Sequence, residues 1–162
     1  EIDKNIKEYN YESFVSYMPT LKEHLISQLR LIDIDDRKFK ICEYIIQNID
    51  DNGYLETDIS EIAKTLNEDT GKVEAMLKII QGLDPIGVGA RDLEECLFLQ
   101  VKEYNYPIIE DLIKNHLKDI AFNKMTKIAK EMELSLEDLQ KACDFIKKLE
   151  PKPGRTYGGN SN

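Results

Sequence analysis

Residues 83 to 93 read Leu83-Asp84-Pro85-Ile86-Gly87-Val88-Gly89-Ala90-Arg91-Asp92-Leu93 and separate two strongly periodic helical segments. Pro85 disfavours helical geometry at Asp84, and Gly87 and Gly89 permit backbone angles that side chains oppose. Asp92 can accept hydrogen bonds from the free amides of the next helix. The remaining positions are largely apolar: Leu83, Ile86, Val88 and Leu93. The stretch therefore predicts a built corner between packed helices rather than a slack linker.

The corner also carries a family resemblance. The residues involved are Asp84-Pro85-Ile86-Gly87-Val88-Gly89-Ala90-Arg91-Asp92-Leu93-Glu94-Glu95-Cys96-Leu97. This run resembles the signature of the core-binding region of bacterial sigma-54, the enhancer-dependent sigma factors of RNA polymerase. The resemblance continues, in order, through Leu21-Lys22-Glu23-His24-Leu25 with Gln28-Leu29, Asp51-Asn52-Gly53-Tyr54-Leu55 and Pro151-Lys152-Pro153-Gly154.

This resemblance implies the part of a sigma-54 factor that holds it on the bacterial RNA polymerase core. In that family an amino-terminal region answers an ATP-driven activator, and a carboxy-terminal region reads the promoter. Neither motif is present here, so promoter DNA would be contacted only through regions absent from this chain. The resemblance also implies a cytoplasmic protein that is monomeric when free. We expect no cofactor, no small-molecule substrate and no membrane partner.

Composition is compatible with that interpretation. The 162 residues are 41% hydrophobic and 33% charged, with no apolar run long enough for a membrane span. The net charge of −9 disfavours a general DNA binder, which normally needs a basic face. Three widely spaced cysteines in apolar patterns predict buried, reduced thiols. Because the first residue is Glu1, we expect a fragment of a longer protein.

Hydrophobic periodicity predicts an all-α fold of two packed helical subdomains, a four-helix bundle followed by a three- to four-helix bundle. The predicted division is an acidic linker (1–19), a first subdomain (20–83), a junction corner (84–92), a second subdomain (93–154) and a polar tail (155–162). Thr20 and Glu23 predict a capping box at the first helix. The second helix is expected from Asp35 to the Asn52-Gly53 pair, where glycine suits the C-terminal position.

Two further helices have specific expectations. One begins at Pro107, which suits a first helical turn, and continues with His116 and Ile120 on its inner face. The last opens at a capping-box-like Ser135-Leu136-Glu137-Asp138 sequence and runs until Pro151.

The two halves of the chain are related at a spacing of 66 residues. Ile62-Ala63-Lys64 recurs as Ile128-Ala129-Lys130, and Leu83-Asp84-Pro85 is matched by Leu149-Glu150-Pro151. Each half therefore ends with a short helix, a turn, a longer helix and a proline-containing corner. Two related subdomains explain this pattern, and convergence on a common helix-turn-helix arrangement is the alternative.

Catalytic and metal-binding motifs are poorly supported. His24 and His116 lack neighbouring catalytic partners, and packing or surface roles are favoured. The segment Asn48 to Gly53 is similar to half a calcium loop, but Ile59 stands where the bidentate glutamate belongs. The Gly87-Val88-Gly89 run lacks the strand and third glycine of a nucleotide loop. Structural turns are favoured in both places.

The rival function is sequence-specific DNA binding by the helix-turn-helix-like units. Their second helices contain no arginine and carry acidic residues near their starts, where phosphate would approach, which disfavours groove binding. A self-associating adapter is a third possibility. Arg91 could pair with Glu94 or Glu95, or could fork onto a carboxylate across the junction. The predicted partner-binding residues are Asp35, Asp36, Glu61, Arg91 and Glu95, and the predicted structural corner comprises Asp84, Pro85, Gly87, Gly89 and Asp92.

Overall fold

A computed structural model describes residues 18–157 and confirms the all-α prediction. Residues 18–157 contain nine α-helices and one short 3-10 helix, with isolated β-bridges but no longer strand. The predicted acidic linker lies outside the described residues except for Met18 and Pro19, and so does the polar tail beyond Tyr157. No helix in the described range is both long and apolar enough to cross a membrane.

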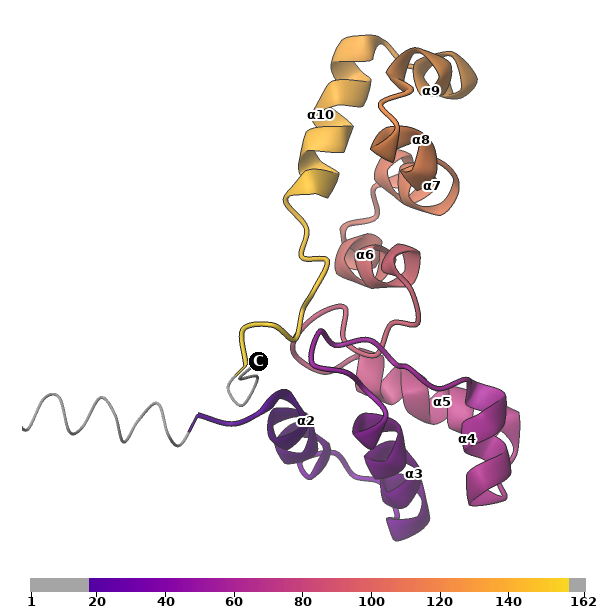
Figure 1. The fold of residues 1–162 in the computed structure, drawn as a ribbon, viewed down its shortest axis with the longest axis vertical. Helices are drawn as coiled ribbons and strands as arrows, with labels where there is room; N and C mark the ends of the chain where they lie inside the picture. The colour runs from indigo at the N-terminus through magenta and orange to yellow at the C-terminus, as the bar shows by residue number, and fades with distance from the viewer. Residues whose placement is uncertain (1–17, 158–162) are drawn as a thin grey trace, which may run out of the picture.

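The first unit consists of four helices and one core (Figure 1). Its helices are α2 (Leu21–Leu29), α3 (Asp36–Gln47), α4 (Ile59–Leu66) and α5 (Thr70–Gln81). Helix α3 packs against both α2 and α5, and α4 packs against α5. The α2 stripe of Leu21, Leu25 and Leu29 is buried in the core, as the sequence periodicity predicts.

The second unit lies beyond the corner and has its own core (Figure 1). Its elements are α6 (Leu93–Val101), η1 (Lys102–Tyr104), α7 (Pro107–Asn115), α8 (Leu117–Ala121), α9 (Met125–Met132) and α10 (Leu136–Lys147). Helices α6 and α10 both pack on α7, and α9 packs on α10. A small third cluster of Ala90, Cys96 and Leu99, covered by Tyr54, lies where the two units meet.

Side-chain caps explain where several helices begin. The Thr20 hydroxyl accepts from the Glu23 amide, and the Glu23 carboxylate accepts from the Thr20 amide, so the predicted capping box is present. Asp92 accepts from the Glu95 amide at 2.8 Å, as predicted for the start of the helix after the corner. Ser135 accepts from the Asp138 amide in the same way.

Three helix boundaries differ from the prediction. Helix α3 ends at Gln47 rather than at Asn52-Gly53, because the Asp50 carboxylate accepts from the Asn52 and Tyr54 amides and shapes a turn. Gly53 does have a positive φ of +101°, but it lies within that turn and not at the C-terminus of the helix. Helix α10 ends at Lys147, four residues before Pro151.

The helix predicted to continue through His116 is instead broken there. The His116 amide closes α7 by donating to the Leu112 carbonyl, and its φ of −131° leaves the helical path. Helix α8 then takes a new direction, from which Leu117 and Ile120 pack on the second core only in part. The apolar residues keep their helical spacing across His116, so the sequence pattern does not indicate this break.

The corner joins the units through its glycines and backbone. Gly87 and Gly89 have φ +99° and +81°, which confirms the predicted need for glycine. The Gly89 amide donates to the Gly53 carbonyl, and the Leu55 amide donates to the Ala90 carbonyl. Leu83 and Val88 are buried as expected, but Ile86 and Leu93 are 62% and 45% exposed. Apolar packing by those two residues is therefore not what holds the corner.

A second contact between the units is made by residues Pro151–Tyr157, which we name the return segment. It runs from α10 back toward α2 (Figure 1). The Gly154 amide donates to the Asn52 carbonyl, and the Tyr54 hydroxyl donates to the Pro151 carbonyl. A Cβ on Gly154 would lie only 2.5 Å from the Asp51 carbonyl oxygen, so the fit leaves no room for a side chain.

Candidate protein-docking site

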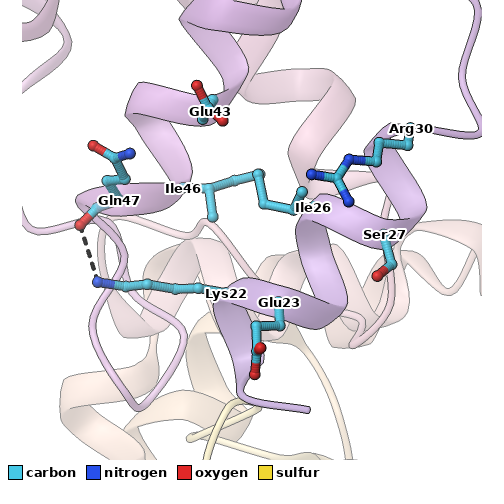
Figure 2. A pocket seen from close by; sticks show the side chains of 8 residues that line it. All are labelled: Lys22, Glu23, Ile26, Ser27, Arg30, Glu43, Ile46 and Gln47. Carbon is cyan, nitrogen blue, oxygen red and sulfur yellow. Dashed lines mark hydrogen bonds between the residues drawn. The ribbon is translucent and has the colours of Figure 1, made fainter.

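A groove of about 470 Å³ runs between α2 and α3 of the first unit (Figure 2). Ile26 and Ile46 point toward one another across its floor. The rim carries both charges and is formed by Lys22, Glu23, Ser27, Arg30, Glu43 and Gln47. An apolar floor with a mixed polar rim suits a helix or an extended segment of another protein.

Two rim residues are already committed to the fold. The Lys22 ammonium donates to the Gln47 carbonyl at 3.1 Å and so links the first turn of α2 to the end of α3. Glu23 closes the capping box of α2. The groove was not anticipated from the sequence. Its signal was Ile26, an apolar residue that falls outside the buried stripe of α2.

The predicted acidic residues Asp35, Asp36 and Glu61 are exposed, but the structure does not gather them into one cluster. Arg37, beside Asp36, forks onto Glu68 just beyond the end of α4, so the start of α3 lies next to that end. Glu61 lies in the first turn of α4, toward its opposite end. Asp35 also has a structural role, because its carboxylate accepts from the Lys38 amide as the N-cap of α3.

Arg91 makes both of the contacts that its sequence position left open. Its guanidinium forks onto the two Glu95 oxygens at 3.0 and 2.7 Å, and a third nitrogen donates to Glu74 at 3.1 Å. Glu95 belongs to α6 and Glu74 to α5. One side chain therefore links the corner, the second unit and the first unit. A direct contact of Arg91 and Glu95 with a partner protein stays a prediction.

The ionisation of this network follows from its contacts. Burial acts to raise the pKa of the Glu95 carboxyl, but hydrogen bonds and charge from Arg91 outweigh it, so the pKa lies below its usual value. The hydrogen bond to Glu95 raises the pKa of Arg91, which burial only partly offsets. The ion pair is therefore fully charged at neutral pH.

Asp84 is the second polar centre of the corner. Its carboxylate oxygen lies 2.9 Å from His24 Nε2 and accepts from the Tyr157 hydroxyl at 2.8 Å. The rings of His24 and Tyr157 stack with centroids 4.9 Å apart. Hydrogen bonds from His24 and then Tyr157 lower the pKa of Asp84, and burial together with Asp84 raises the pKa of Tyr157 to about 12. His24 thus has the packing role that the sequence favoured.

Each unit holds the residue before its corner proline with a glutamine, an arrangement we call the glutamine clamp. Gln28 accepts from the Asp84 amide at 2.8 Å and donates to the Asp84 carbonyl at 2.6 Å. Gln100 does the same to Glu150, at 2.9 and 2.8 Å. Sequence reasoning missed these roles. A spacing of 72 residues relates Gln28 to Gln100 and would have revealed them.

The alternative sites have structural explanations. The Asp50 carboxylate in the calcium-loop-like segment is used by two amides of its own turn. The three cysteines are buried and unpaired, as expected, and burial raises the pKa of Cys42 to about 11. In the helix-turn-helix-like units, Lys72 of α5 pairs with Glu68, and Lys141 of α10 pairs with Glu137. Neither lysine is left uncompensated for phosphate.

The fold is all-α and consists of two helical units, each with its own core. Comparison with known proteins gives its family, since the family described as "Sigma-54 factor, core binding domain" matches residues 10–162. The chain belongs to the sigma-54 core-binding domain family, as the corner signature indicated.

Individual relatives agree with this assignment. A Clostridium kluyveri protein that is named as an RNA polymerase sigma-54 factor is 38% identical over 157 residues. These residues are 96% of this chain and 34% of that protein. RNA polymerase sigma-54 factor 1 of Bradyrhizobium diazoefficiens is 34% identical over 94% of this chain and 32% of its own length. The Caulobacter vibrioides sigma-54 factor is 36% identical over 91% and 30%, respectively. The chain thus spans about a third of these relatives.

Proposed function

We propose that this chain docks a sigma-54-type transcription initiation factor on the core of bacterial RNA polymerase and performs no catalysis itself. The observation that carries the proposal is the match of residues 10–162 to the sigma-54 core-binding domain family. The relatives are named as RNA polymerase sigma-54 factors. Other regions of such a factor would then read the promoter and respond to its activator.

The first unit is the proposed main docking surface. Its α2–α3 groove offers an apolar floor to a helix or strand of polymerase. Exposed acids at the starts of α3 and α4, including Asp36 and Glu61, would complement basic surface and speed encounter. The clamps, the Arg91 network and the return segment would hold both units, and hence the flanking regions, in a fixed relation.

The primary test is a titration of the labelled chain with purified core polymerase, with duplex DNA as a parallel titrant. Saturable binding to polymerase but not to DNA is the expected result. Binding to DNA alone would transfer the function to the helix-turn-helix-like units. Binding to neither titrant would count against docking by this part of the protein.

A charge-reversal experiment tests the acidic surface. Asp36→Lys with Glu61→Lys should weaken polymerase binding and reduce its salt dependence. Asp35 is changed only to Asn, which still caps α3. The matched control is Glu94→Lys with Glu137→Lys. It also replaces two acidic residues by lysine in first helical turns, but in the second unit. If both pairs of substitutions changed polymerase affinity and its salt dependence equally, the acidic residues of the first unit would have no special role in docking.

The groove is tested separately by Ile26→Asp, which places a charge on its floor while leaving the buried α2 stripe intact. We expect at least about a tenfold loss of polymerase affinity if a hydrophobic segment occupies it. Thr126→Asp, at an exposed helical position of the second unit, is the control for an added charge. Unchanged affinity in Ile26→Asp would exclude the groove.

A further inference from the structure

The second unit contains a group of three potential metal ligands that the docking proposal does not use. His116 lies at the break between α7 and α8, Asp119 lies in α8, and Glu131 lies in α9. One ligand atom from each lies within 4.8 Å of the others. The start of α8 and helix α9 therefore bring an imidazole and two carboxylates to one place.

The imidazole nitrogen on this side has no hydrogen-bond partner. His116 Nδ1 is buried and makes no hydrogen bond. Its nearest carboxylate oxygen, Glu131 Oε2, is 3.7 Å away, which is too far for a hydrogen bond. The His116 side chain is only 11% exposed, whereas Glu131 is 47% exposed. A buried polar atom without a partner costs free energy, so its presence beside two carboxylates calls for an explanation.

We propose that His116 Nδ1 and the carboxylates of Asp119 and Glu131 bind a divalent transition-metal ion of the zinc class. Zinc takes histidine nitrogen and carboxylate oxygen at about 2.0 to 2.2 Å, with water able to fill a fourth position. Such ligands are about 3.3 Å apart, so the group must contract slightly on binding. The exposed Glu131 can supply that movement. An imidazole ligand selects against magnesium and calcium, which prefer all-oxygen sites.

The ion would tie together a weakly packed part of the second unit. Helix α8 has five residues, none of them buried, and it touches only its neighbours α7 and α9 closely. His116 ends α7 and Glu131 belongs to α9, so one ion would link the break in the chain to the next helix. We assign the ion a structural role, because it would connect the α7–α8 break to α9.

Lys127 is the built-in competitor for this site. Its ammonium lies 3.5 Å from Asp119 Oδ2, so its positive charge opposes a metal ion at that carboxylate. The charged groups assembled around His116 are thus Glu131 from α9, Asp119 from α8, and Lys127 behind Asp119. Metal binding and a simple ion pair of protonated His116 with Glu131 are competing uses of the same residues.

The test is a calorimetric titration of the tag-free, reduced 162-residue chain with zinc chloride, with magnesium chloride as the comparison ion. We expect one equivalent of zinc to bind and magnesium not to compete. Glu131→Gln and Asp119→Asn should each lower zinc affinity at least about tenfold, whereas Glu137→Gln in the same unit should not change it. Lys127→Gln should raise the affinity. Zinc at one hundred times its Kd should raise the Tm by about 5 to 10 °C.

Several results would overturn the proposal. One is the absence of saturable zinc binding. Another is binding that Glu131→Gln and Asp119→Asn leave unchanged, which would point to the cysteines. Lowered zinc affinity in Lys127→Gln would also contradict the competition argued above. His116→Asn should abolish binding, and if that variant fails to fold, the exposed Glu131 variant decides the question. Cobalt substitution, read from its visible absorption, gives the coordination geometry independently.

Discussion

The two helical units are built on the same frame but are closed differently. Helices α4 and α9, and likewise α5 and α10, have equal lengths and are 66 positions apart. Helices α2 and α6 also have equal lengths and are 72 positions apart, and each carries a glutamine clamp near its end. These additional matches favour related subdomains over convergence.

The difference lies between the first and second matched helices, that is, between α2 and α4 and between α6 and α9. The first unit fills that place with α3, one capped twelve-residue helix. The second unit uses α7 and α8, which are separated by the break at His116. The frame therefore tolerates a change in one wall as long as the clamped corner and the last helix pair are kept. We expect the corner interactions, which both units share, to contribute to the stability of each unit.

The largest expected effect comes from replacing both corner glycines. Gly87→Val with Gly89→Val places β-branched residues at positive φ and puts a Cβ 3.0 Å from Cys96 Sγ. We expect the free energy of unfolding to fall by at least about 3 kcal/mol, measured by urea denaturation, and polymerase affinity to fall with it. Gly71→Val is the control, since Gly71 has open space around it. An unchanged Tm and affinity in the double variant would refute our account of the corner.

The two clamps should differ in strength. Gln100→Leu leaves polar groups of Glu150 unpaired in a partly buried place and should cost about 2 kcal/mol in thermal or urea unfolding. Gln28→Leu affects an exposed site and should cost about 1 kcal/mol. Gln140→Leu, which loses only a surface bond to Asp144, serves as the control. If both substitutions lowered the free energy of unfolding equally, the greater burial of the Gln100 clamp would not make it stronger than the Gln28 clamp.

The Arg91 link should contribute less. Arg91→Lys loses the forked geometry but keeps the charge, and about 1 kcal/mol is expected because Arg91 is 43% exposed. Arg37→Lys is the matched control, because Arg37 also forks onto a glutamate but within a single unit. If both variants unfold alike, Arg91 does not couple the two units.

The smallest expected effect is acid sensitivity of the junction. Asp84 and Glu95 have pKa values below normal in the folded state, so their contribution is complete above the unfolded pKa of about 4. It is lost as the pH falls below that value toward the folded pKa. Urea midpoints measured between pH 6 and pH 3 should show this loss, and Asp84→Asn or Glu95→Gln should each flatten it. If the urea midpoint depended on pH in both variants as it does in the unchanged protein, Asp84 and Glu95 would not be the source of the acid sensitivity.

The helices, the corner and its glycines could be predicted because each depends on local sequence rules. Thr20, Asp92 and Ser135 are caps read from neighbouring residues. The end of α3 could not be placed, because Asp50 acts through side-chain bonds to amides that no hydrophobic period reveals. Likewise, the helix break at His116 lies within an unbroken apolar stripe.

Site prediction was limited by contacts between distant residues. Arg91 was correctly expected to choose among acidic partners, but Glu74 is 17 positions away and comes close only in the folded chain. The α2–α3 groove needs two helices to be packed before it exists. Exposure of Asp35, Asp36 and Glu61 followed from their charge, whereas their separation along α3 and α4 did not.

The return segment has a consequence for the order in which the protein is made. The first unit is completed by Gly154 and Tyr157, which bond to Asn52 and Asp84, although about 60 residues of the second unit are translated in between. A ribosome therefore exposes the helices of the first unit well before it supplies the segment that closes them. We expect the earlier unit to reach its full stability only after the return segment is made, and translation pauses after α5 would prolong the less stable state.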